Sequence, residues 1–472
     1  MRIHIRFSKI IVSLFLNKFI TYNLANTKVR TTVIADRFFR DNFPFSPSRS
    51  PFFYGWTILG IGTLGMLMSI PGQTVGVSVF TDYLMEALGL SRNAISIAYL
   101  IGTVSSAFLL SAGGRAFDRF GARKMGVTVT LLLALTLMYL SLSDSFASVL
   151  SALLGGRWTT AVSFTVITFG FLLLRFFGQG TLTMTSRNMV MKWFDKRRGM
   201  ANAVLGIAVS LGFSLAPQVL DLFVQSQGWR GAWRFMAVIL LLFAAAVYLL
   251  FRDNPQALGL TPDGKGPIKV KQSLHAETTA ARDFTPPEAR RTYAFWLFNF
   301  TLVLSALIMT AFTFHVVSIF EEAGLSRSQA VIIFLPASLV AVSSQFIGSW
   351  ISDYIPLRYI ALIQSIGAVL LGAGVVILAN PVGKILVVVG LGFTQGMMGI
   401  TSNITWPRFF GLRHLGAVSG YAMAWSVAGS AVGPYFFSLS LDLTGTYASA
   451  ALITLISGGL LAIGALFVRR PV

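Results

Sequence analysis

An arginine stands near the middle of a long apolar run, and three polar residues follow it at helical spacing. Arg175 lies within residues 164–186, and the polar residues four, eight and eleven positions later are Gln179, Thr183 and Ser186. On an α-helix these side chains share one face. A guanidinium in the centre of a bilayer costs at least about 2.5–3.5 kcal/mol, so it has to face a partner or a wet cavity. Two roles are open: an anion contact or gating group in a central path, and a structural hydrogen bond to another helix.

Isolated polar residues in other apolar runs could line the same path. They are Gln73, Gln395, Asn403, Thr310 and His315. Amides and hydroxyls also hold membrane helices together, so a path-lining role and a packing role are both open. His315 could titrate near neutrality, which leaves proton coupling and an interfacial structural role open for it.

These residues do not form a recognisable catalytic or metal-binding set. The chain has no cysteine, and none of its four histidines has a second histidine at ligand spacing. The apolar runs contain no nucleophile–base pair and no carboxylate dyad. No GxxxxGK[ST] phosphate-binding loop occurs either. We therefore expect no enzyme activity, no metal, no cofactor and no ATP-driven transport.

Composition places the polar residues in a membrane protein. The chain has 472 residues, of which 55% are hydrophobic and 11% charged, whereas a soluble domain has about a quarter charged residues. A spanning helix needs about 20 apolar residues. We predict an all-α membrane protein with twelve such spans: 56–84, 93–112, 125–142, 164–186, 200–224, 231–251, 293–320, 330–350, 359–379, 383–405, 416–441 and 447–468.

The two halves of the chain repeat one another. The run EALGLSR at 86–92 returns as EEAGLSR at 321–327. Further positions correspond in the same order, pairing Asp118 with Asp353, Arg123 with Arg358, and Gly199 with Gly416. A duplicated apolar unit predicts a transporter whose path lies between the halves.

Basic residues predict the orientation and the domain boundaries. After residue 50, most of them lie in the loops after the second, fourth and tenth spans and in a central linker, 252–291. The positive-inside rule then places both termini in the cytoplasm. The net charge of +20 follows this pattern, so we expect no nucleic-acid partner.

The linker separates two six-helix bundles, 51–251 and 292–472. Residues 1–50 form a basic N-terminal tail, which is disordered, an over-called start or a membrane-surface helix. The first half carries an insertion at 143–160, which we expect to be a loop that keeps Arg157 outside the membrane.

The loop after the second span resembles the signature loop of the major facilitator superfamily. It reads GRAFDRFGARK at 114–124, and a degenerate copy at 349–358 keeps an Asp and an Arg. The resemblance implies two pseudo-symmetric six-helix halves that work by alternating access. It also implies that Asp118 contacts Arg119, Arg123 and the start of the eleventh helix near Gly416, because a carboxylate is stabilised at a helix N-terminus. The implied gating residues are Gly114, Asp118, Arg119, Gly121, Arg123, Asp353 and Arg358.

A finer resemblance concerns the monocarboxylate carriers and the oxalate–formate antiporters. The run WFDKRRGMAN at 193–202 is similar to their junction between the fourth and fifth helices. The runs PGQT at 71–74 and WPRFF at 406–410 are similar to bacterial members. Those carriers use a basic residue in the first, eighth or eleventh span, and here these spans contain none.

We therefore expect a secondary active transporter, a monomer in a bacterial inner membrane. The expected cargo is a small organic anion such as a monocarboxylate, moved by proton symport or by anion exchange. Two alternatives stay open. One is an efflux or uptake carrier for a neutral or amphipathic compound, and the other is a non-transporting membrane sensor.

Overall fold

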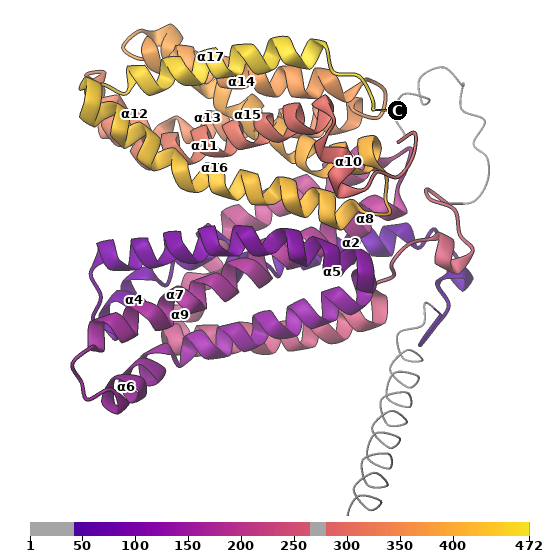
Figure 1. Cartoon of the computed structure of the whole chain (residues 1–472), viewed down its shortest axis with the longest axis horizontal. Helices are drawn as coiled ribbons and strands as arrows, with labels where there is room; N and C mark the ends of the chain where they lie inside the picture. Colours follow the sequence, from indigo (N-terminus) through magenta and orange to yellow (C-terminus); the bar gives the residue numbers. More distant parts are fainter. Residues whose placement is uncertain (1–41, 265–279, 472) are drawn as a thin grey trace, which may run out of the picture.

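The computed structural model describes residues 42–264 and 280–471, and within these ranges the chain forms helices and no strand (Figure 1). The predictions for residues 1–41 and for 265–279 of the linker lie outside the described residues. Two short turns flank the first bundle, η1 (Pro47–Arg49) and η4 (Gln256–Leu258).

The helices of the first half are interrupted at proline, at glycine or at a π-helical segment. In chain order they are α2 (Gly55–Leu67), η2 (Ile70–Gly72), α3 (Thr74–Ser78), α4 (Thr81–Leu88), α5 (Arg92–Ser141), α6 (Ser143–Leu153), α7 (Thr159–Leu174), η3 (Arg175–Leu182), α8 (Thr183–Trp193) and α9 (Arg198–Leu250). The first predicted span is broken at Pro71, since proline cannot donate the backbone hydrogen bond that a continuous helix needs.

The second half begins with the short helix α10 (Pro286–Arg290), which ends the linker. The helices that follow are α11 (Tyr293–Glu322), α12 (Arg327–Ile332), α13 (Phe334–Ile351), α14 (Leu357–Val376), α15 (Pro381–Phe410), α16 (Leu415–Thr444) and α17 (Ala448–Leu466).

Among the described residues, nine helices are long and apolar enough to cross a membrane. Two of them are too long for one crossing. Helix α5 turns back at Gly121 and α9 at Gly228, where the backbone φ angles are 80° and 71°. Such positive φ values suit glycine, which has no Cβ. Each of these two helices therefore contains two of the predicted spans. Helix α16, which is less apolar than those nine helices, corresponds to the eleventh predicted span.

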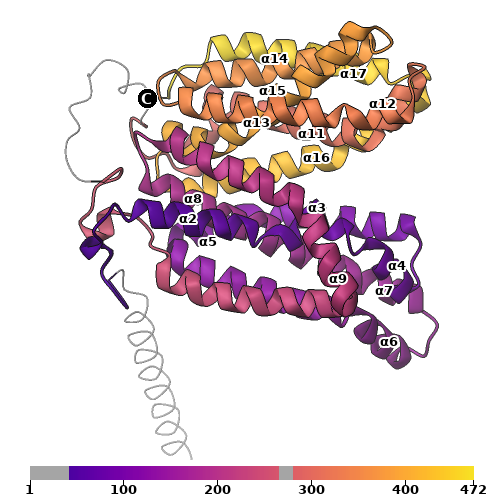
Figure 2. The same ribbon diagram turned by 180° about the vertical axis from the view of Figure 1, so that it is seen from behind.

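The two halves form separate bundles that lie side by side, the first indigo to magenta and the second orange to yellow (Figure 1). Helix α5 packs against α16 on one side of the seam, and α9 packs against α13 on the other (Figure 2). Each half has its own apolar clusters, one centred on Phe80 and Trp233 and another on Phe298 and Ile404.

The insertion at 143–160 is a helix and not the expected loop. Helix α6 occupies most of it and is tied to the bend of α9 by an ion pair between Asp144 and Arg230. It lies at the end of the bundle opposite to α8 and α10 (Figure 1). Arg157 is exposed in the turn after it, outside the helices on either side.

The absence of native cysteine allows a direct test of the predicted orientation. We expect a cysteine at Arg157 to react with a membrane-impermeant maleimide on intact cells. A cysteine at Lys196, exposed between α8 and α9, should react only after the membrane is opened. The reverse labelling pattern would contradict the orientation taken from the basic loops, and the unsubstituted chain provides the blank.

Candidate functional site

The fourth span is interrupted at Arg175, where the π-helical segment η3 begins. The Arg175 side chain is only 5% exposed. Its Nη1 donates to the carbonyl oxygen of Gly72 at 3.1 Å and lies 3.4 Å from the Thr74 hydroxyl. The guanidinium also lies over the ring of Tyr99, 5.2 Å from its centroid. The break in the first span thus provides the carbonyl that holds Arg175 in place.

A second arginine of the same span, Arg187, was not among the predicted site residues. It comes twelve positions after Arg175 and is 6% exposed. On a regular helix the two side chains would point about 120° apart. A π turn adds one residue, which reduces this angle to about 20° and puts both on one face. Within the described part of the chain, the Arg187 guanidinium has no hydrogen-bond partner, and its Nε is fully buried.

Both arginines face a cavity of about 280 Å³ between the two halves. The first half contributes the charged and amide groups Arg175, Gln179 and Arg187. The second half contributes hydroxyls and apolar side chains: Thr310, Ser402, Ser419, Ser426, Ser430, Leu302, Ala306, Met309, Met398, Trp406, Met423 and Val427. The described lining includes no carboxylate. The cavity therefore combines positive charge from one half with neutral hydrogen-bonding groups from the other.

At one end of the seam, Asp118 caps the first turn of α16. Its two carboxylate oxygens accept hydrogen bonds from the backbone N–H groups of Gly416 and Ala417, both at 2.8 Å. This is the contact that the resemblance implied. Gly114 allows the close approach, because a Cβ there would lie 2.0 Å from the carbonyl oxygen of Gly416. The helix dipole and two orphan N–H groups stabilise the carboxylate.

The repeat of this contact joins the other pair of helices. Asp353, which follows α13, accepts hydrogen bonds from the N–H groups of Gly199 at 2.8 Å and Met200 at 3.2 Å, in the first turn of α9. Asp353 also pairs with the buried Arg408, which donates in addition to the carbonyl of Ser352. Each half thus caps a helix of the other half.

The expected partners of Asp118 are different from those in the structure. The Arg123 Nε donates to the carbonyl of Tyr248 at 2.7 Å, and its backbone N–H donates to Asp253. Arg119 is exposed and lies over the ring of Phe120. Gly121 permits the turn that brings Asp253 close, since a Cβ there would meet its carboxylate. Arg119 and Arg123 therefore do not pair with Asp118, because the turn at Gly121 directs Arg123 toward the end of α9.

Comparison with known proteins decides the family. The model of the Major Facilitator Superfamily matches residues 57–434. The chain belongs to this superfamily. The predicted all-helical membrane fold of this family is thereby confirmed, as is the expectation that the chain is a transporter family member and not an enzyme.

Three relatives show how far the similarity extends. The probable sulfoacetate transporter of Cupriavidus necator is 23% identical over 83% of this chain and 88% of its own length. The hexuronate transporter of Bacillus subtilis is 23% identical over 84% and 89%. A bacterial homologue of the iron transporter ferroportin, solved in an outward-facing state, has a TM-score of 0.62 and 16% identity, with 87% and 98% of the two chains covered. This last likeness shows the fold alone.

Two predicted path residues of this superfamily member, Thr183 and Gln73, belong to a network between the first and fourth spans. The Gln73 amide donates to Ser69 at 3.0 Å and to Thr183 at 3.3 Å, and the Thr183 hydroxyl donates to Ser69 at 3.0 Å. Neither residue lines the 280 Å³ cavity. They fix the broken first span against the π-helical segment that carries Arg175.

The remaining predicted residues occupy different parts of the fold. Thr310 lines the cavity and shares a 2.8 Å hydrogen bond with Ser430. Asn403 is buried between the halves, where it bonds to Asn202. Gln395 is exposed and lies outside the described lining of the cavity.

His315 and Arg358 also lie away from the cavity. The His315 Nε2 is 3.0 Å from the carbonyl oxygen of Pro434, and its Nδ1 is 3.2 Å from the hydroxyl of Tyr447. These contacts join α11 to α16 and to Tyr447, the residue that precedes α17. Arg358 lies over the ring of Tyr359, and within the described residues it forms no hydrogen bond or ion pair with Asp353.

Proposed function

We propose that this transporter carries small organic anions, bound between Arg175 and Arg187. The observation that carries the proposal is the buried guanidinium of Arg187, which faces the cavity and has no hydrogen-bond partner among the described residues. A buried charge is strongly destabilising unless it is paired. A carboxylate or sulfonate in the cavity would supply the missing acceptor.

The other half of the lining fits the rest of such a cargo. Five hydroxyls line the cavity, from Thr310, Ser402, Ser419, Ser426 and Ser430, and a hydroxyl can donate one hydrogen bond and accept others. Those of Thr310, Ser402 and Ser419 already donate to backbone carbonyls, whereas Ser426 has no such bond among the described residues. A volume of about 280 Å³ lies at the small end of ligand cavities. We therefore propose a cargo with few heavy atoms, one or two anionic groups and polar substituents.

The names of the relatives support the same class of cargo. Sulfoacetate and hexuronate, the compounds for which the two transporters are named, are both small organic anions. The narrower proposal of a monocarboxylate rests on the sequence resemblance at 193–202.

We propose anion exchange as the coupling mode. When the cavity is empty, two positive charges stay buried within it, and at least one is unpaired. Reorientation of the empty carrier would move these charges through a closed, dry intermediate, which is costly. A bound anion neutralises them. Exchange, in which the carrier reorients only when loaded, avoids the unfavourable step.

The orientation follows from the basic loops, so the end closed by Asp118 and Asp353 is proposed to face the cytoplasm of a bacterial inner membrane. The cavity is then reached from the outside in this conformation. We propose that breaking these two contacts opens the cytoplasmic side. Asp118, Asp353 and their neighbours in the two signature loops form the gate in this proposal.

Counterflow in proteoliposomes tests the proposal. Vesicles loaded with sulfoacetate, glucuronate, lactate or neutral glucose are diluted into the corresponding labelled compound, with and without a pH gradient. We expect accumulation of an anion, independent of the pH gradient, and little net efflux into anion-free buffer. Accumulation of glucose alone would favour the neutral cargo, to which Met398, Met423 and Trp406 offer apolar contacts. Absence of counterflow for a wide panel would favour a sensor.

A further inference from the structure

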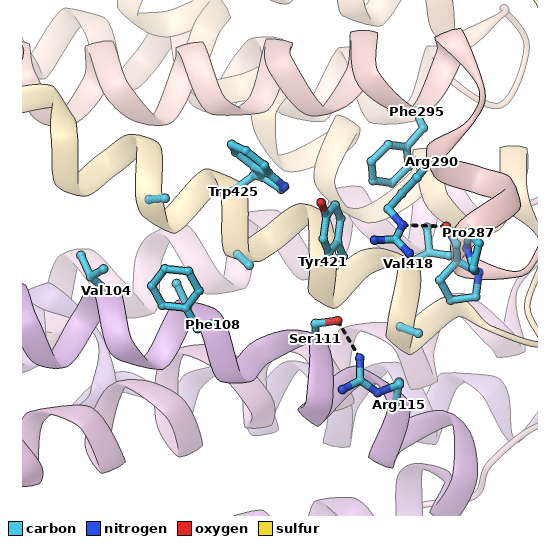
Figure 3. Close-up of a pocket in the computed structure, with 15 residues that line it drawn as sticks. Val104, Phe108, Ser111, Arg115, Pro287, Arg290, Phe295, Val418, Tyr421 and Trp425 are labelled. Carbon is cyan, nitrogen blue, oxygen red and sulfur yellow. Dashed lines mark hydrogen bonds between the residues drawn. The ribbon is translucent and has the colours of Figure 1, made fainter.

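A second cavity opens at the outer edge of the seam between the halves, on the α5–α16 side (Figure 3). Its volume is about 680 Å³, and most of its wall is apolar. Phe108 is 80% exposed and Trp425 40% exposed, so this wall faces the hydrocarbon layer around the protein. The cavity is distinct from the one that holds Arg175 and Arg187, with which it shares no lining residue.

Two arginines stand together at one end of this cavity, on opposite walls (Figure 3). Arg115 belongs to α5 and donates to the Ser111 hydroxyl at 3.0 Å. Arg290 belongs to α10 and lies over the ring of Tyr421, 5.0 Å from its centroid. Both side chains are exposed, and neither has an acidic partner in the part of the chain that the structure describes.

Helix α10 is held rigidly enough to present Arg290. Thr285 and Glu288 form a capping box at its start, and Pro286 and Pro287 fill its first turn. Hydrogen bonds from the hydroxyl and backbone of Thr285, together with Arg282, lower the pKa of Glu288 to about 2. The carboxylate of Glu288, on the same short helix as Arg290, is therefore ionised and already bound to Thr285 and Arg282. The positive charge of Arg290 remains available to an external anion.

We propose that this cavity binds an anionic phospholipid, with its acyl chain along Phe108 and Trp425 and its phosphate between Arg115 and Arg290. A long apolar wall that ends in a pair of unpaired cations matches the amphiphilic shape of such a lipid. Basic pockets between membrane helices at the cytoplasmic side suit anionic headgroups, and the basic loops assign this end to the cytoplasm. Because Arg115 and Arg290 lie on opposite sides of the seam, the bound lipid also links the halves beside the Asp118 contact.

Brominated lipids provide the test, since bromine on an acyl chain quenches tryptophan fluorescence only at short range. The full-length protein is reconstituted in phosphatidylcholine vesicles that contain increasing amounts of dibrominated phosphatidylglycerol or dibrominated phosphatidylcholine. We expect stronger quenching by phosphatidylglycerol at equal mole fraction. Most of this excess should disappear in Trp425→Phe, which removes the reporter from the cavity wall and keeps an aromatic ring.

The arginines are tested with a matched charge control. Arg115→Gln combined with Arg290→Gln should raise the mole fraction of brominated phosphatidylglycerol that gives half-maximal quenching by about fivefold or more. Arg290→Gln alone and Arg291→Gln each remove one charge. The first should also weaken the preference, whereas the second, whose side chain lines a different surface pocket, should leave it unchanged. The melting temperatures of these variants should match, because the three side chains are exposed.

Three outcomes would overturn the proposal. Equal quenching by both brominated lipids in the unsubstituted protein would show that the site does not select an anionic headgroup. An unchanged preference in the double arginine variant would place the headgroup elsewhere. Complete displacement of the lipid by glycerol phosphate would assign the site to a soluble anion, because the apolar wall would then contribute nothing to binding.

Discussion

Replacing Arg187 by glutamine should lower the affinity for the transported anion by about 10- to 150-fold, without loss of thermal stability. A hydrogen bond to a charged group contributes about 1.5–3 kcal/mol, which corresponds to this range. The Arg187 guanidinium donates no hydrogen bond to the described residues, so its replacement breaks no side-chain hydrogen bond of the empty protein. The melting temperature should even rise, since an unpaired buried charge is removed. The half-saturating concentration for counterflow and the melting temperature are the two measurements.

Arg175 provides the matched comparison within the same helix. Arg175→Gln should cause a similar loss of affinity but also lower the melting temperature, because its Nη1 bonds to Gly72. The anion affinities of Arg175→Lys and Arg187→Lys should each lie between those of the glutamine variant and the unsubstituted protein, since an ammonium cannot reproduce the planar fork of a guanidinium. If Arg187→Gln lowered the melting temperature and kept the affinity, Arg187 would be structural, and the neutral-cargo alternative would move ahead.

The overall architecture was predictable because it depends on composition and on the repeat. Apolar runs of sufficient length fix the number of spans, whatever their detailed packing. The contact of Asp118 with Gly416 was implied by the family resemblance, whereas that of Asp353 with Gly199 was not predicted. Asp118 and Asp353 occupy equivalent positions, as do Gly416 and Gly199, so the repeat relates the two contacts.

The central site was only partly predictable, because helix geometry within the membrane decides which residues face the path. Hydropathy ended the fourth span at Ser186, one residue before Arg187, although α8 continues to Trp193. A π turn leaves no clear pattern in sequence, and the shared face of Arg175 and Arg187 depends on it. Pro71 lies within the first predicted span, 56–84, but neither the break there nor the direction of the Gly72 carbonyl was predicted from the sequence.

The same limitation applies to side chains whose partners come from distant segments. The signature loop resembles that of its family, yet the hydrogen-bond partners of Arg123 are Tyr248 and Asp253. They lie at the end of α9, more than a hundred residues away in the sequence. The helical form of α6 was missed because its polar residues resemble those of a loop. Its large apolar residues, including Val149 and Leu153, are exposed, and its buried face consists of the small residues Ser143, Ala147 and Ser151.

The last prediction separates the two halves of the proposed gate. Asp118→Asn should open the end closed by Gly416 and Ala417 while leaving the melting temperature nearly unchanged. A carboxylate at a helix N-terminus contributes about 0.3–2 kcal/mol, and the described part of the chain shows no ion pair of Asp118 that the substitution would break. Asp353→Asn should open the gate as well. It should also lower the melting temperature strongly, because it leaves the guanidinium of Arg408 buried without its counter-ion.

Removal of one partner from a buried ion pair is destabilising by about 3–5 kcal/mol. Because Asp353 and Arg408 lie in the same half, this loss should appear as instability of that half in either conformation. Asp353→Asn combined with Arg408→Gln should therefore recover much of the melting temperature but not the closed gate, since the caps on Gly199 and Met200 remain weakened.

The distance between spin labels at Lys196 and Arg413, exposed loop positions in opposite halves, reports the gate independently of stability. If Asp118→Asn and Asp353→Asn lowered the melting temperature equally, the Arg408 pair would have no separate structural role. If neither widened the distance, the two caps would not hold the gate closed.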